Sequence, residues 1–186
     1  MTVPVFDTSA SSMTLRGTEE PSVSAGAFRE VMSHMAETVC LITAAHEGQR
    51  LGRTATAVLS LSPSPPSVLV SIDLDSRLAG MIVKSRSFSL MVLARDQAII
   101  ADAFAGKLGA MDRFAIGVWG EWPSGNPLLY GATAAMDCEV IGTIETQTHL
   151  LLAGGLIATE TATGKDPLVW HRRGYRDLGP SPLKAT

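Results

Sequence analysis

The sequence has little charge, few cysteines and no long apolar run. Of its 186 residues, 18% are charged and two are cysteines, and the net charge is −3. No positive surplus is present to attract a polyanion, so we expect no nucleic-acid partner. No segment reaches the roughly 18 uninterrupted apolar residues that a membrane span needs, so no membrane partner is expected either. The 46% of hydrophobic residues instead indicates a folded chain that covers part of its surface by self-association.

Familiar catalytic and metal-binding motifs are also missing. Cys40 and Cys138 lie far apart in apolar surroundings, so we expect buried free thiols in a reducing cytoplasm. The sequence contains no GxxxxGK[ST] phosphate loop, no GxGxxG after a strand, no HExxH and no GxSxG. These absences argue against a serine hydrolase and a metal hydrolase, and we expect no metal site. An enzyme with this sequence would take its chemistry from a bound cofactor.

The chain length predicts one domain. We expect a disordered, Ser- and Thr-rich tail without a secretory signal over residues 1–24, the domain over 25–178 and a short tail over 179–186. Ser24, Ser76 and Asp96 are predicted N-caps of helices over 25–37, 77–84 and 96–105. Strands are predicted over 38–45, 51–61, 67–73, 87–94, 132–146, 149–161 and 168–171, with an irregular loop over 119–131. Many strands joined by tight turns favour a mainly β chain with short helices, closed into an antiparallel barrel.

Hydroxyl groups follow one face of the second predicted strand. Strand alternation places Thr54, Thr56 and Ser60 on that face, and the small residues Ala55 and Ala57 on the other. Small residues let a flat ligand approach the backbone, whose amides and carbonyls can bind its polar edge. The same pattern also fits a solvated strand face.

Three other segments carry ionisable groups. Between Asp73 and Arg77 a strand end meets a helix start, where free amides, the Ser76 hydroxyl and Arg77 could hold a phosphate or simply form a capped turn. His149 stands alone in a β-rich run, as either a site residue or an exposed one. The third segment, a phosphate-binding candidate or a solvated strand end, comprises His171, Arg172, Arg173 and Gly174.

Several segments, in the same order, resemble the short-chain flavin reductase family over about residues 25–178. The most diagnostic is GRTATAVLSLSPSPPSVLVSI at 52–72, which is similar to the family pattern G-x-T-x-(N/S)-S-x-x-S-x-S-x-x-P-P. SIDLDSRL at 71–78 resembles the family's strand end with a serine before an arginine. The remaining similar segments are FAGKLGAMDRF at 104–114, His149 before an apolar strand, and PLVWHRRGYRDL at 167–178.

The resemblance implies a split β-barrel that binds FMN, or alternatively FAD, at a homodimer interface. It places Thr54, Ala55, Thr56 and Ala57 at the isoalloxazine edge. It assigns the ribityl phosphate arm to Ser60, Ser76 and Arg77, and it includes Asp73 among the cofactor-binding residues. His149 would be the catalytic residue, which orients the nicotinamide of NADH or NADPH or protonates the flavin. The other residues expected near the nicotinamide cofactor are His171, Arg172, Arg173 and Gly174.

The expected function is reduction of FMN by NADH or NADPH, after which reduced flavin passes transiently to a separate monooxygenase. Two alternatives remain at the level of sequence. One is an enzyme of the same fold that uses FMN on a different acceptor, such as a corrinoid or a pyridoxal-type substrate. The other is a flavin-binding module without turnover.

Overall fold

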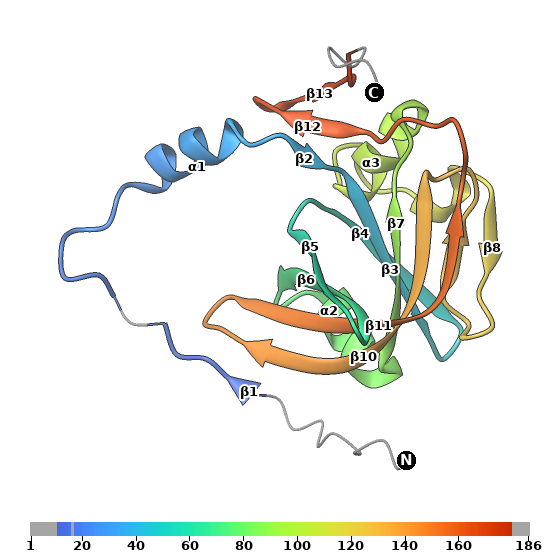
Figure 1. Ribbon diagram of the computed structural model, residues 1–186, viewed down its shortest axis with the longest axis horizontal. Coiled ribbons are helices and arrows are strands. Elements are labelled where there is room, and N and C mark those ends of the chain that lie inside the picture. Colours follow the sequence, from blue (N-terminus) through green and yellow to red (C-terminus); the bar gives the residue numbers. More distant parts are fainter. Residues whose placement is uncertain (1–10, 16, 180–186) are drawn as a thin grey trace.

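The computed structural model describes residues 11–15 and 17–179, and its largest element is one curled antiparallel sheet. Figure 1 shows this sheet wrapped around the middle of the molecule, with helix α1 standing apart from it. The sheet order is β4-β3-β7-β10-β11-β6-β5. Its strands are β3 (Cys40–His46), β4 (Gln49–Ala55), β5 (Val58–Pro63), β6 (Pro66–Asp73), β7 (Ser87–Val92), β10 (Ala134–Glu145) and β11 (His149–Thr161).

The two edge strands of the sheet, β4 and β5, follow one another in the sequence. The chain leaves β4 at Ala55 and begins β5 at Val58, and three residue steps span at most about 10 Å. The sheet must therefore curl until its two edges come close together, which makes a barrel. β4 and β5 do not pair with each other, so the barrel is split along the seam between these two strands. This agrees with the predicted mainly β chain and split barrel.

Both faces of the central strands are buried. Leu41 and Met91 belong to one core cluster, whereas their neighbours Ile42 and Leu90 belong to another. Side chains alternate between the faces of a strand, so β3 and β7 separate the two clusters. The cluster that contains Ile42 and Leu90 also includes side chains of helix α2 (Arg77–Ser85). The cluster that contains Leu41 and Met91 includes side chains of α3 (Ala98–Phe104).

The two cysteines are fully covered within this core. Cys40 on β3 and Cys138 on β10 are both free thiols, as predicted. Burial raises the pKa of each thiol to about 12, and the neighbouring Asp137 carboxylate adds to the effect at Cys138. Neither thiol is therefore ionised near neutral pH.

Helices α1 and α2 begin as the sequence predicts but differ in burial. Ser24 and Ser76 each accept a hydrogen bond from an amide in the first turn. The apolar residues of α2 turn into the core, whereas α1 (Ala25–Ser33) buries none of its residues. Its apolar face stays exposed in the single chain, at Phe28, Val31 and Met32.

Three predicted elements differ from the structure. The continuous strand over 51–61 is wrong, because the chain turns at Thr56 and Ala57, where the Thr56 carbonyl accepts from the Val58 amide. The loop over 119–131 instead contains a short hairpin of β8 (Trp119–Glu121) and β9 (Pro127–Leu129). Asp96 is no N-cap, because it lies inside a 3-10 turn, η1 (Arg95–Gln97), that precedes α3.

The chain ends in a small sheet that joins distant segments. Its order is β13-β12-β2, with β2 (Glu37–Thr38), β12 (Val169–His171) and β13 (Gly174–Arg176). Near the other end, β1 (Ser11–Ser12) runs parallel to the end of β10. Much of the predicted N-terminal tail, residues 1–10 and 16, lies outside the described residues, as do residues 180–186. In the described part of the chain, no helix has the length and apolar character needed to cross a membrane.

Candidate functional site

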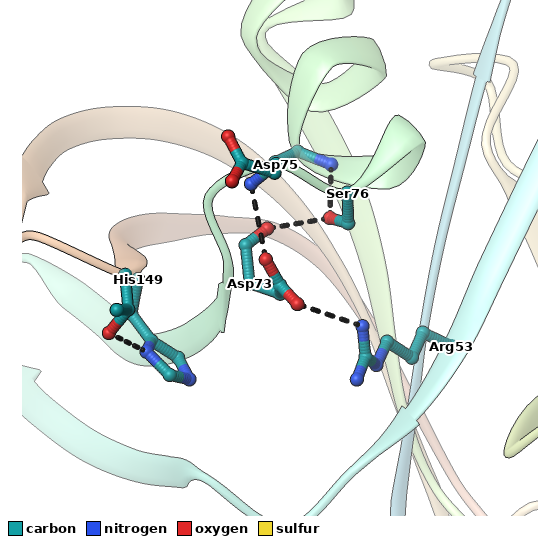
Figure 2. Close-up of polar contacts among 7 residues, drawn as sticks. Arg53, Asp73, Asp75, Ser76 and His149 are labelled. Carbon is teal, nitrogen blue, oxygen red and sulfur yellow. Dashed lines mark hydrogen bonds and ion pairs between the residues drawn. The ribbon is translucent and has the colours of Figure 1, made fainter.

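Several predicted site residues meet where β6 ends. The register of β6 and β11 places His149 directly opposite Asp73. Asp73 Oδ2 lies 4.0 Å from Nη1 of Arg53 on β4. The Asp75 amide donates to Asp73 Oδ1, and the Ser76 hydroxyl donates to the Asp73 carbonyl. Figure 2 shows these groups around one turn, with His149 beside them. The structure therefore assembles Asp73, Ser76 and His149 from two neighbouring strands.

The seam between β4 and β5 runs next to this turn. The Ala57 carbonyl accepts from the Ser71 amide, two residues before Asp73. Neither the Thr56 amide nor the Ala57 amide donates to an acceptor within the described residues. Ala57 is also solvent-exposed. Two successive backbone donors are thus left for a ligand at the position that the sequence assigns to the isoalloxazine edge.

The hydroxyl groups of the predicted strand face do not all point to this place. Thr54 Oγ1 donates to the Ala101 carbonyl of α3 at 2.7 Å. Its hydroxyl therefore links the barrel to α3 and is not a free donor for a ligand. The break at Thr56 separates Ser60 from Thr54, so the predicted continuous row of hydroxyls is not formed.

A cleft of about 600 Å³ opens beside the same turn. Its polar lining includes Ser76, the carboxylate of Asp112 and four arginines, Arg50, Arg53, Arg77 and Arg113, and its aromatic lining is Phe104 and Phe114. The volume lies within the range of small-molecule sites. Guanidinium groups of this number favour an anionic ligand, and they bind phosphate especially well because they donate in pairs.

A second cavity of about 540 Å³ lies on the other side of the seam. It contains two of the predicted residues, Thr56 and Ser60, among mostly apolar neighbours such as Val58, Leu59 and Met35. The predicted flavin-binding set is therefore divided, with Thr56 and Ser60 at this cavity and Ser76 and Arg77 at the cationic cleft.

The C-terminal candidates lie elsewhere in the chain. Arg172 and Arg173 form the turn between β12 and β13, both at positive φ. The Arg172 amide donates to the Ser33 carbonyl, and Arg173 pairs with Glu30 of α1 at 2.6 Å. Figure 1 shows β12 and β13 beside α3, at the end of the barrel away from α2. One chain therefore does not bring the 171–174 turn to His149.

Sequence reasoning missed Arg50, Arg53 and Gly52 as cleft residues. All three lie on β4, where the sequence pattern drew attention to the hydroxyl-bearing residues and not to the arginines. At Gly52 a Cβ atom would lie 2.7 Å from Phe104 Cε1, so only glycine lets this ring pack on the strand. The spacing of Arg50 and Arg53 in the sequence does not predict a binding site. Arg77 and Arg113, which line the same cleft, come close to them only when the chain folds.

A polar network attaches the C-terminal hairpin to α3. Lys107 Nζ and the Tyr175 hydroxyl both donate to Asp102 Oδ1, at 2.7 and 2.6 Å. These hydrogen bonds hold the pKa of Asp102 below its usual range. Burial, together with the Asp102 carboxylate, raises the pKa of Tyr175. Lys107 also lies over the rings of Trp170 and Tyr175, so the hairpin, α3 and the loop after α3 are held as one unit.

Comparisons with known proteins agree with this fold. The flavin reductase-like domain model matches residues 32–179. The chain is 34% identical over 160 residues to an FMN reductase (NADH), RutF, of Methylorubrum extorquens, covering 86% of this chain and 78% of that one. It is 35% identical over 164 residues to the RutF protein of Pseudomonas syringae pv. syringae, covering 88% and 92%. The solved styrene monooxygenase flavin reductase of Pseudomonas putida S12 superposes with a TM-score of 0.74 at 27% identity, covering 84% and 99%.

A family model that matches most of the chain, together with relatives at this level of sequence identity, shows to which family the chain belongs. The chain belongs to the family of flavin reductase-like domains. The resemblance drawn from the five sequence segments is confirmed, and so is the predicted split-barrel fold.

Proposed function

We propose that the protein is an NADH-dependent FMN reductase that supplies reduced FMN to a separate monooxygenase component. One observation carries this proposal: the arginine-lined cleft ends beside the seam, where two backbone donors are unpaired and His149 stands opposite Asp73. An anionic group at the cleft and a polar ring edge at the seam match the two ends of FMN. The names of the relatives, FMN reductase (NADH) and styrene monooxygenase flavin reductase, support the same cofactors and kind of partner.

The phosphate end of FMN would be held by Arg53 and Arg77 and by the free amides that follow Ser76, whose own hydroxyl donates to the Asp73 carbonyl. Arg53 is kept in place by Asp73, and Ser76 caps α2, whose first residue is Arg77. The N-terminus of a helix adds a positive potential at this point, which favours a bound anion. These residues come from β4 and the start of α2, two elements that line the same cleft, so the fold places them together.

The ring end of FMN would lie at the seam. The chemistry supplied by bound FMN is acceptance of a hydride from NADH and delivery of its electrons to a separate acceptor. The amides of Thr56 and Ala57 would donate to the ring edge that gains negative charge, which stabilises the reduced form. His149, exposed and held at Nδ1 by the Thr148 hydroxyl 2.9 Å away, would orient the nicotinamide or supply a proton.

The proposal includes a homodimer. Helix α1 exposes Phe28 by 57% and Val31 by 69%, on a helix that buries nothing in its own chain. A face of this kind is stabilised when a second copy covers it. The 171–174 turn is fixed to α1, so a role for it at the nicotinamide requires that the second copy supply it. The two buried, unpaired thiols fit a reducing compartment, and we propose the cytoplasm.

The deciding experiment follows NADH absorbance with purified protein and catalytic FMN in air, with NADPH and FAD as parallel replacements. Rapid loss that needs both protein and flavin supports the proposal and ranks the cofactors. Retained yellow colour without NADH loss would favour a binding module or an enzyme with another acceptor. Absence of both flavin binding and NADH loss would overturn the proposal.

A further inference from the structure

The chain before β2 forms an arm that is not part of the barrel. The arm comprises residues 13–33, apart from residue 16, which lies outside the described residues. Most of it precedes residue 32, where the match to the family model begins. Each described residue from 13 to 32 is exposed, so the barrel of the same chain covers none of them. Figure 1 shows the arm standing away from the barrel between β1 and β2.

Both ends of the arm are attached to the barrel of their own chain. At the first end, next to β1, the Met13 amide donates to the Glu145 carbonyl at the end of β10. At the second end, Glu30 of α1 pairs with Arg173 in the turn between β12 and β13. Figure 1 shows these two attachments at opposite ends of the barrel. The middle of the arm is therefore held in place while its apolar side chains have no cover in their own chain.

The arm and the edge strand β5 expose apolar side chains of similar kind. On the arm these include Phe28 and Val31, and on β5 they are Leu59, which is 51% exposed, and Leu61. The cavity of about 540 Å³ connects the two regions, because Met35, just after the arm, and Leu59 both line it. Large apolar side chains gathered in this way mark a surface that another molecule covers.

We propose that the arm of one copy lies on β5 of a second copy, and that β1 is the latch that holds the arm in position. Both apolar surfaces belong to every copy, so a two-fold dimer covers both at once, whereas a different protein would have to cover each separately. The pairing of β1 with β10 fixes the start of the arm, which gives this two-residue strand a function. The inference rests on the proposed homodimer and adds which surfaces meet in it.

Cysteine cross-linking tests which surfaces meet. The double variant Val31→Cys/Leu59→Cys is treated with a flexible bis-maleimide, and covalent dimers are detected on a denaturing gel. The native thiols Cys40 and Cys138 are buried, so they do not compete for the reagent. Val31→Cys/Val83→Cys is the matched control, because Val83 is 53% exposed but lies on α2. We expect covalent dimers from the first variant and few from the second. Equal yields, or none from either, would overturn the inference.

Proline substitutions test the latch. Met13→Pro removes the amide that donates to the Glu145 carbonyl. Thr14→Pro is the matched control, because the Thr14 amide donates to no backbone acceptor within the described residues. Loss of one hydrogen bond predicts about a fivefold higher dimer Kd for Met13→Pro, with Thr14→Pro unchanged. Light scattering across a dilution series measures both, and equal Kd values would overturn the latch.

The same samples separate this inference from the proposed function. A monomeric wild type would overturn the homodimer and the arm contact together. Absence of NADH oxidation with catalytic FMN, alongside covalent dimers from Val31→Cys/Leu59→Cys, would count against the reductase activity and would support the arm contact.

Discussion

His149 on β11 and Asp73 on β6 are opposite residues in an antiparallel register. Directly opposite residues have Cβ atoms about 5 Å apart, so the histidine is fixed beside the turn that leads into α2. The Ser76 hydroxyl donates to the Asp73 carbonyl, and Arg53 approaches the Asp73 carboxylate. One strand pair thus connects the proposed catalytic residue to the proposed phosphate site.

Replacing His149 by alanine should slow hydride transfer and leave flavin binding nearly unchanged. His149 is exposed, and it is not among the described residues that line the arginine-lined cleft. Loss of a group that positions or protonates a substrate costs about 100-fold or more in rate. Stopped-flow reduction of bound FMN by NADH measures this rate, and fluorescence quenching measures the FMN Kd. His46→Ala is the control, because His46 ends β3 and is not among the residues that line the arginine-lined cleft. Equal loss of rate and affinity would exclude the proposed role.

Replacing Arg77 by glutamine should weaken binding of FMN but not of riboflavin. Riboflavin has the same ring and ribityl chain but lacks the phosphate that Arg77 would hold. Removal of one charge-assisted hydrogen bond predicts about a tenfold increase in the FMN Kd. Flavin fluorescence titrations on wild type and Arg77→Gln provide the comparison. Arg95→Gln is the control, because Arg95 pairs with Asp177 and does not line the cleft. A similar loss for both flavins would place the phosphate elsewhere.

A charge on the exposed face of α1 should dissociate the proposed dimer. Val31→Asp would place a carboxylate in the interface, where it would be desolvated without a partner. Light scattering at micromolar concentration should show a dimer for wild type and a monomer for the variant. Val83→Asp on α2, at a side chain that is 53% exposed, is the control and should remain dimeric. A monomeric wild type would contradict the proposed interface.

The Asp102 network should make stability depend on pH at both extremes. The pKa of Asp102 is lowered in the folded chain, so its contribution is complete above the unfolded value of about 3.9 and is lost as pH falls through the folded value. The pKa of Tyr175 is raised, so its contribution holds below about 10 and is lost as pH rises through the folded value. Urea unfolding of wild type and Asp102→Asn should therefore differ most between about pH 4 and 10. A difference that is constant across this range and beyond it would contradict the assignment.

Gly154→Ala should destabilise the barrel, whereas Gly142→Ala should not. A Cβ atom at Gly154 would lie 2.5 Å from Cζ of the fully buried Phe88, but at Gly142 the nearest atom is 3.8 Å away. Overpacking of this kind costs about 1–3 kcal/mol, or roughly 2–4 °C in Tm per kcal/mol for a chain of this size. Thermal unfolding followed by circular dichroism measures both variants. Equal Tm values would mean that Phe88 moves aside without cost.

Some parts of the fold and site could be read directly from the sequence because their causes are local. Ser76 caps α2 as predicted, because its hydroxyl and the amide that it accepts from are three residues apart. The strands predicted over 132–146 and 149–161 also form, as β10 and β11. The family resemblance depended on motifs of this local kind, and it was sufficient to predict the fold and the flavin chemistry.

Other parts were decided only by long-range closure. The alternating pattern of 51–61 predicts one strand, but curling of the sheet forces a break at Thr56 and turns the Thr54 hydroxyl toward α3. Arg50 and Arg113 are far apart in the chain and meet in one cleft only because β4 lies beside the segment after α3. The sequence by itself determined which local elements form and which family they belong to. The tertiary structure decided which charges share a cleft, because that depends on which strand edges approach each other when the barrel curls.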